Sequence, residues 1–261
     1  MIDLFHVPVS NAPSPMVEAA RRYEERFCTE FATLTWFPRT LLKQLHQPLP
    51  GRHAPPNAAI AAVQQPSVLR QLETISTVAN TPSPDFLARA AYRRSLEVLF
   101  RALRDQPFSL TAAASNFCVA PQREGALLAT RLGYLKDIPS LTPEAKRIPY
   151  DSGLLVGLSE VVPPTGRDTC LLVDGAIASG ATLVAIIHHL CHVRSFRIYA
   201  AHSAMSGLWA LYNYGQQASI EIRCAVGEVS GTLNEDYFSV YPSGKLVLGD
   251  VGDTIASLGS Q

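Results

Sequence analysis

The stretch LLVDGAIASGAT, residues 171–182, is the most informative part of the sequence for predicting the fold. Its first residues form an apolar run that predicts a buried strand, and this run ends in the acidic residue Asp174. A loop of small residues follows, and a helix is predicted from Thr182 to Leu190. A buried strand, a small-residue loop and a helix in this order are typical of an α/β protein.

The same alternation of strand and helix flanks this stretch on both sides. Upstream, a strand is expected at Phe117–Ala120 and a helix at Gly125–Leu132. Downstream, strands are expected at Phe196–Ala200 and Ile220–Val226, with a helix at Ser206–Tyr214 between them. Such spacing implies right-handed crossovers, so the sequence predicts a doubly wound, mostly parallel sheet covered by helices on both faces.

The N-terminal part of the chain has a different pattern. Residues 15–45 carry helical spacing in two pieces, and prolines crowd residues 48–56. A long amphipathic helix is expected over residues 86–103. We therefore expect an N-terminal helical extension with a Pro-rich linker over residues 1–62, followed by one α/β domain over residues 63–261.

Composition excludes several classes of protein. The 22 Lys+Arg and 22 Asp+Glu residues give a formal net charge of zero, without the broad basic surface that drives nucleic-acid binding. The five cysteines are odd in number and lack C-x-x-C spacing, which argues against a disulfide framework or a zinc knuckle. No apolar run reaches the roughly 18 residues of a membrane span, and the first residues lack signal-peptide features. We expect a cytoplasmic protein with no nucleic-acid or membrane partner.

The loop after Asp174 has the composition of an anion-binding site. Gly180, Ala181 and Thr182 allow backbone N–H groups to approach a phosphate, and the helix N-terminus adds the positive end of a dipole. Ser179 and Thr182 can donate hydroxyl hydrogen bonds, and Asp174 lies where doubly wound sheets bind ligands. On this local pattern alone, a tight turn capped by Thr182 remains the alternative.

Motifs of other site classes are absent from the sequence. It contains neither the P-loop pattern G-x-x-x-x-G-K-[ST], nor G-x-G-x-x-G after a strand, nor the G-x-S-x-G elbow of hydrolases. His188 and His192 are one helical turn apart, a spacing that metal ligands use. Their segment lies behind the small-residue loop and should face away from a ligand, so we expect no metal site there.

Residues 173–182 resemble the 5-phosphoribosyl-1-pyrophosphate (PRPP) signature of the type I phosphoribosyltransferases. Most of that superfamily has two adjacent acidic residues, whereas here Gly175 follows Asp174. This resembles the uracil phosphoribosyltransferase branch, in which proline replaces the second acid. Residues 119–125 are similar in position to the strand and pyrophosphate loop of that branch. The C-terminal strings Thr-Leu-Asn-Glu and Gly-Asp-Val-Gly-Asp resemble the segments that wall its uracil site.

The resemblance implies transfer of 5-phosphoribosyl from PRPP to uracil or a uracil-like acceptor, with release of pyrophosphate. Mg²⁺ would bind through PRPP rather than through protein ligands. Asp174 would hold the ribose hydroxyls, and Arg123 would act with it in catalysis. The further implied roles are the 5′-phosphate for Ala178, Ser179, Gly180, Ala181 and Thr182, pyrophosphate for Arg123 and Gly125, and the acceptor for Gly249, Asp250, Asp253 and Tyr241.

Departures from the family pattern leave the acceptor open. Gln122 and Glu124 stand where the family has Leu and Ala, and Thr254 replaces an Arg. Residues 241–247 are an insertion, and the basic arm expected between residues 136 and 162 matches poorly. A phosphoribosyltransferase with a non-standard acceptor, such as an unusual heterocycle or an amino-sugar hydroxyl, is the second hypothesis. A PRPP-binding regulator is the third. The family also implies a homodimer or larger homo-oligomer and a role in nucleotide salvage.

Overall fold

The computed structural model describes residues 5–13, 15–18, 31–60, 66–81, 117–122, 124–132, 138–150 and 153–247, together with 87–88, 90–91, 94–95 and 98. Most of the helix predicted over residues 86–103 lies outside these ranges. So do Arg123 and the segment that carries Gly249, Asp250 and Asp253. Within the described ranges, no helix combines the length and the apolar character needed to cross a membrane.

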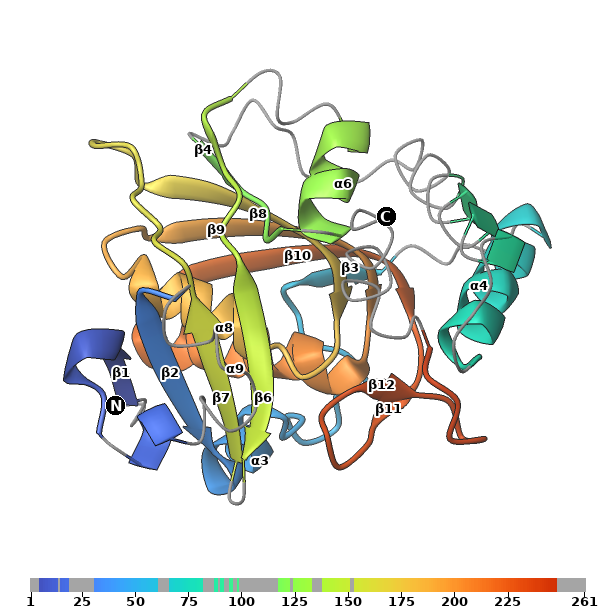
Figure 1. The fold of residues 1–261 in the computed structure, drawn as a ribbon, viewed down its shortest axis with the longest axis horizontal. Helices are drawn as coiled ribbons and strands as arrows, with labels where there is room; N and C mark the ends of the chain where they lie inside the picture. The colour runs from blue at the N-terminus through green and yellow to red at the C-terminus, as the bar shows by residue number, and fades with distance from the viewer. Residues whose placement is uncertain are drawn as a thin grey trace.

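A six-stranded parallel sheet lies at the centre of the molecule (Figure 1). Its strands are β3 (Ala58–Ile60), β4 (Phe117–Val119), β5 (Ser140–Leu141), β8 (Thr169–Ile177), β9 (Ser195–Ser203) and β10 (Glu221–Val229). They lie in the order β3-β10-β9-β8-β4-β5, and every neighbouring pair is parallel. The predicted α/β class with a mostly parallel sheet is confirmed.

Helices cover both faces of this sheet. Helices α8 (Ala181–His189) and α9 (Met205–Ala218) lie below it in Figure 1, and α6 (Glu124–Leu132) lies above it. All three were predicted from apolar spacing, and each begins one residue before its expected start. Helix α4 (Pro66–Ala79) follows β3 along the chain. The strands between these helices are apolar over most of their length because neighbours cover both of their faces.

A second, antiparallel sheet packs against α8. It contains β1 (Phe5–Pro8), β2 (Thr33–Pro38), β7 (Gly153–Leu158) and β6 (Ala145–Tyr150), in the order β1-β2-β7-β6. Helix α8 contacts β7 and β6 on this side, and the central sheet on the other. One buried core therefore runs from the central sheet through α8 to the second sheet, and every buried residue of α8 is apolar.

The helical prediction for residues 15–45 is confirmed at both ends of the described part and wrong for residues 33–38. Residues 15–18 and α3 (Arg39–Leu45) are helical, but Thr33–Pro38 forms β2. The β-branched and aromatic residues of Thr33–Pro38 favour a strand, and pairing with β7 outweighs the helical spacing of the aromatic residues. Because β2 pairs with β7, and β3 with β10, both strands join sheets that later residues build. A domain boundary at residue 62 stays a prediction.

The strand order has a topological switch point between β4 and β8, and the crevice named below is this position at the carboxyl ends of the two strands. Along the chain, β4 to β5 steps toward one edge of the sheet, whereas β8 to β9 to β10 steps toward the other. Helices α6 and α8, which follow β4 and β8, lie on opposite faces (Figure 1). Open α/β sheets bind ligands at such a switch point, outside the carboxyl ends of the strands.

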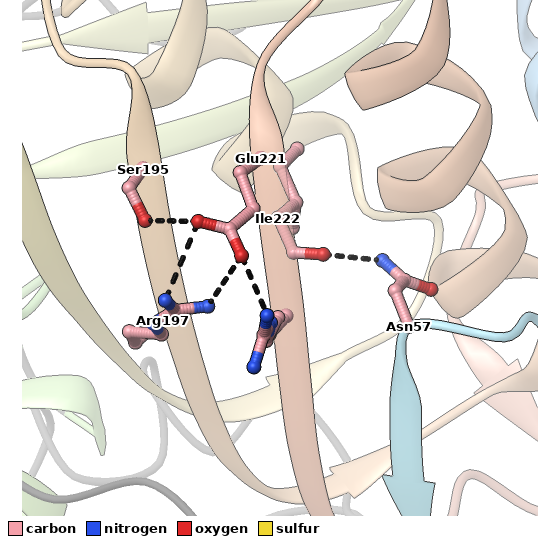
Figure 2. A network of polar contacts seen from close by, with 6 residues as sticks. Asn57, Ser195, Arg197, Glu221 and Ile222 are labelled. Carbon is pink, nitrogen blue, oxygen red and sulfur yellow. Dashed lines mark hydrogen bonds and ion pairs between the residues drawn. The ribbon is translucent and has the colours of Figure 1, made fainter.

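Polar contacts hold the opposite, amino-terminal end of the sheet (Figure 2). Glu221 Oε2 accepts a hydrogen bond from Ser195 Oγ at 2.8 Å, and Oε1 lies 3.2 Å from the guanidinium of Arg197. Asn57 Nδ2 donates to the carbonyl oxygen of Ile222 at 3.0 Å and so joins β3 to β10. These contacts fix the register of three strands at the end away from the crevice.

A chain of hydrogen-bonded side chains attaches β1 to β2 and α8. His189 Nε2 lies 3.2 Å from the carbonyl oxygen of Val161, which only accepts, so His189 Nδ1 is free to accept from His6 Nε2 at 3.3 Å. His6 Nδ1 then accepts from the hydroxyl of Thr35 at 2.5 Å. Burial, followed by the charges of His188 and His189, lowers the pKa of His6 to about 4. The network therefore needs a neutral His6.

The folded chain is expected to lose stability in acid partly through His6. Its pKa is about 6.5 when unfolded and about 4 when folded, so its contribution is present above pH 6.5 and is lost as the pH falls toward 4. The full shift corresponds to about 3 kcal/mol, and partial exposure reduces this to about 1–2 kcal/mol. Urea unfolding at pH 7.5 and pH 4.5 should show a smaller acid loss in His6→Gln than in the wild type. Equal losses in both proteins would contradict the assignment.

Candidate active site

Asp174 lies beside the crevice, beyond the last residue of β8 that pairs with β4. Its Oδ1 accepts a hydrogen bond from the amide of Gly175 at 2.7 Å. Burial raises the pKa of Asp174 to about 6. The Gly175 amide, the positive charge of Arg147 and the Ala176 amide oppose this shift. A carboxyl group held in a desolvated position that disfavours its charge is typical of functional sites.

The small-residue loop (Ala178–Gly180) presents backbone amides at the start of α8. No hydrogen bond within the described part of the chain uses the amides of Gly180, Thr182 or Leu183, and no side chain caps the helix. The Ala181 amide, by contrast, donates to Ser179 Oγ at 3.3 Å. Two of the five predicted phosphate-binding residues, Gly180 and Thr182, therefore have N–H groups without a partner in the described part of the chain, at the positive end of the helix dipole.

Helix α9 packs directly behind this loop. Gly180 has φ +77°, a left-handed conformation that favours glycine, and a Cβ there would lie 3.0 Å from the carbonyl oxygen of Gly207. A Cβ on Gly207 would lie 2.5 Å from the carbonyl oxygen of Ala178. The two glycines allow backbone to meet backbone, so the position of the loop depends on the first turn of α9.

His46 holds the loop from another side. It follows α3 directly, and its Nε2 lies 2.9 Å from the carbonyl oxygen of Ser179. Because that oxygen only accepts, Nε2 carries the proton. Burial lowers the pKa of His46, and the hydrogen bond to Ser179 opposes this. Asn213 of α9 donates to the carbonyl oxygens of Leu45 and Gln47, which fixes His46 between α3 and α9.

Gly125 brings the start of α6 to the other edge of the crevice. It is buried, and a Cβ there would lie 2.6 Å from the carbonyl oxygen of Val173. The close approach is thus to the residue preceding Asp174, whereas the resemblance assigns Gly125 to pyrophosphate. That role stays a prediction, as does the role of Arg123.

Arg147 of β6 is a site residue that the sequence analysis missed. Its charge acts on Asp174, and its guanidinium lies over the ring of Phe238, 5.2 Å from the centroid. Phe238 belongs to the hairpin of β11 (Thr232–Leu233) and β12 (Ser239–Val240). Lys146 and Arg147 were the available signal, because they are adjacent basic residues inside the segment where a basic arm was expected.

Tyr241, predicted to contact the acceptor, follows β12 and is half-buried. Burial, and then the charge of Glu228, raise its pKa, whereas a hydrogen bond with Ser230 lowers it. The Leu-Asn-Glu string forms the hairpin turn, where Asn234 Oδ1 accepts from the amides of Asp236 and Phe238. A contact of Tyr241 or of this string with an acceptor stays a prediction.

The carboxyl ends of β9 and β10 also carry polar residues, His202 and Glu228. The rule that selected Asp174, a polar residue near the end of an apolar strand, applies equally to them. Sequence analysis missed both because the two strands were expected to end at Ala200 and Val226, two residues before His202 and Glu228.

The histidines of α8 show no metal arrangement. The helix ends at His189, so His192 does not continue it by one turn, and His188 Nδ1 lies 2.8 Å from the hydroxyl of Tyr214. Among the residues that the structure describes, no group of three or more His, Cys, Asp or Glu could hold a metal ion.

Comparisons with known proteins relate the chain to solved structures. No protein-family model matches it, and no curated protein matches it. The AQ2163 protein from Aquifex aeolicus superposes with a TM-score of 0.53 at 19% sequence identity, over 77% of this chain and 99% of that chain. Adenine phosphoribosyltransferase from Leishmania donovani gives a TM-score of 0.46 at 13% identity, over 79% and 98%. Orotate phosphoribosyltransferase from Mycobacterium tuberculosis, in complex with PRPP, gives 0.34 at 15% identity, over 63% and 91%. At these identities the likeness to the Aquifex protein establishes a shared fold, and the two lower scores establish no family.

Proposed function

We propose that the chain is a PRPP-dependent phosphoribosyltransferase that moves 5-phosphoribosyl to uracil or a uracil-like acceptor. Two features of one strand-loop-helix unit carry this proposal: the desolvated carboxyl group of Asp174 in β8, and the amides at the N-terminus of α8 that have no partner in the described part of the chain. Such amides suit a phosphate, which accepts hydrogen bonds, and a carboxylate on the preceding strand suits sugar hydroxyls, which donate them.

Each part of PRPP then has a partner. The small-residue loop and the amides of Thr182 and Leu183 bind the 5′-phosphate, and Asp174 accepts from the ribose hydroxyls. Arg123 and Gly125 bind the pyrophosphate. The bond from C1 to the pyrophosphate oxygen breaks, and pyrophosphate leaves with the electron pair. The acceptor nitrogen forms the new bond to C1 and loses its proton to solvent. The Asp174 carboxylate stabilises the positive charge that develops on the ribose.

Mg²⁺ is expected to arrive with PRPP, as the resemblance implies. Magnesium keeps several waters and binds through substrate phosphates, so it needs no direct ligand from this chain. When bound, the ion would neutralise negative charge on the leaving pyrophosphate. Asp174 keeps its proposed role of holding the ribose hydroxyls.

The acceptor would contact residues of the C-terminal part of the chain. Tyr241 is proposed to contact it together with Gly249, Asp250 and Asp253, as the resemblance implies. A homodimer or larger assembly and a role in nucleotide salvage belong to the same proposal. The departures at Gln122 and Glu124 keep a non-standard acceptor as the alternative.

Calorimetric titration with PRPP and Mg²⁺ tests the donor site directly. We expect saturable binding, followed by pyrophosphate release when an acceptor is added from a panel of pyrimidines, purines and amino sugars. Release with uracil and no other acceptor would favour the uracil branch. Binding without release on any acceptor would indicate a PRPP-binding regulator, and absence of binding would refute the proposal.

Removing the charge of Arg147 is expected to weaken PRPP binding. Arg147→Met takes a cation away from Asp174 and from a ligand with several negative charges, so KM for PRPP should rise about 10–100-fold. Lys146→Met removes the same charge from the neighbouring position, whose side chain lies on the other face of β6. It should change KM less than about threefold. Equal effects of the two variants would show a general electrostatic contribution instead.

A further inference from the structure

Three polar residues lie on one face of the central sheet, at the carboxyl ends of adjacent strands. In the strand register, Asp174 is opposite Ala200, whereas Ala176 is opposite His202 and His202 is opposite Glu228. Partners in register share a face, so Asp174, His202 and Glu228 project from the same side. With strands about 4.8 Å apart and about 3.3 Å per residue, the Cα of His202 lies about 8 Å from that of Asp174, and that of Glu228 about 12 Å.

Ser230 joins the side chains of His202 and Glu228. His202 Nε2 lies 3.1 Å from both the carbonyl oxygen and Oγ of Ser230. Burial raises the pKa of Glu228, and a hydrogen bond with Ser230 partly opposes this shift. Tyr241 also bonds to Ser230 and lies close enough to Glu228 to sense its charge. Three polar side chains therefore meet at the Ser230 hydroxyl, just outside the ends of β9 and β10.

Counting protons in this cluster leaves two acceptors without donors. The Ser230 carbonyl oxygen only accepts, so His202 Nε2 carries its proton and Nδ1 has a free lone pair. Burial lowers the pKa of His202 to about 4, against the Ser230 hydrogen bond, so the ring is neutral at pH 7. Nδ1 of His202 and Oε2 of Glu228 are both buried and have no hydrogen-bond partner. His202 is only 1% exposed.

Buried polar atoms without partners are rare in folded proteins, because each costs about 1–3 kcal/mol. Two such atoms on neighbouring strands, on the face that carries Asp174, indicate a binding surface that a ligand completes. Both atoms accept hydrogen bonds. The complementary ligand edge must therefore donate at two adjacent positions.

We propose that His202 and Glu228 bind the acceptor base and select a six-membered heterocycle that presents an amino group beside a ring N–H. This inference rests on the proposed function, in which Asp174 holds the ribose. The spacing from Asp174 to His202 and Glu228 suits a ring attached to that ribose. Uracil fits this edge less well, because its single free N–H lies between two carbonyl oxygens, which also accept. An amino-sugar hydroxyl lacks the planar pair of donors.

The test compares uracil with 2-aminopyrimidin-4-one in the full chain, with saturating PRPP and Mg²⁺ and pyrophosphate release as the readout. Glu228→Gln replaces a carboxylate oxygen by an N–H donor at nearly constant shape. His202→Gln keeps a donor for Ser230 but removes the acceptor at Nδ1. Glu221→Gln is the matched control, because it makes the same change at the opposite end of β10, where Glu221 pairs with Arg197 and Arg223 (Figure 2).

We expect the wild type to prefer the aminopyrimidinone over uracil by at least about tenfold in kcat/KM. Glu228→Gln and His202→Gln should lower that preference at least about tenfold, with the affinity for PRPP within about threefold of the wild type. Glu221→Gln should keep the preference. A wild type that binds PRPP yet prefers uracil, releases pyrophosphate with neither base, or keeps its preference in both variants would overturn this inference alone. Absence of PRPP binding would overturn the proposed function with it.

Discussion

Asp174→Asn is expected to lower kcat/KM for pyrophosphate release at least about 1000-fold and, at the same time, to stabilise the fold. Asparagine keeps an oxygen for the Gly175 amide but removes the negative charge that would face the ribose in the transition state. Because the proposed mechanism depends on positioning and charge rather than on a covalent nucleophile, loss of this charge should not be compensated. Steady-state kinetics with PRPP as the varied substrate measures the loss.

The gain in stability follows from the same pKa shift. The pKa of Asp174 is raised from 3.8 to about 6 in the folded chain, so the stability that its protonated form contributes is present below pH 3.8 and is lost as the pH rises to about 6. The full shift is worth about 3 kcal/mol, and partial exposure reduces this to about 1–2 kcal/mol. Asp174→Asn should therefore be more stable than the wild type at pH 7.5 and equally stable near pH 3.5.

Asp168→Asn supplies the control, because Asp168 is exposed just before β8. It should match the wild type in activity and change the stability little. Unchanged kinetics in Asp174→Asn would refute the ribose contact. A lower melting temperature than the wild type at pH 7.5 would refute the desolvated carboxylate.

Gly207→Ala is the second change with a large expected effect. The new methyl group would lie 2.5 Å from the carbonyl oxygen of Ala178 and 2.8 Å from Cγ2 of Ile177, so the loop must move. Displacing a phosphate-binding loop by even a fraction of an ångström separates its amides from the 5′-phosphate. We expect the Kd for PRPP to rise about 100-fold, as measured by calorimetric titration.

Gly215→Ala separates this effect from general destabilisation. Gly215 lies in the same helix, and its methyl group would lie 3.0 Å from the carbonyl oxygen of Ile220, far along α9 from the loop. Both alanines add about 1 kcal/mol of helix propensity. Gly215→Ala should therefore change stability but leave the Kd for PRPP unchanged. Equal losses of affinity in both variants would show that α9 does not position the loop.

The strand β8, the loop after it and the helix α8 could be predicted from local sequence alone. Their apolar run, small residues and helical spacing act between near neighbours in the chain, so residues 171–190 carry the information for their own local structure. The same holds for the alternation of strands and helices from β4 to β10, which predicted a parallel sheet. Asp174 was identified because a carboxyl group near the end of a buried strand is visible without a partner.

The residues that surround Asp174 could not be predicted from local sequence, because they come from distant parts of the chain. Residues 33–38 became a strand because β7, more than a hundred residues later, offers them hydrogen bonds, and local spacing does not record such a partner. His46 and Arg147 reach the site from separate elements, α3 and β6. His202 and Glu228 join the face of Asp174 because β8, β9 and β10 are neighbours in register. Contacts between residues distant in sequence depend on strand order and packing, so the residues that share a site can be identified only from the folded structure.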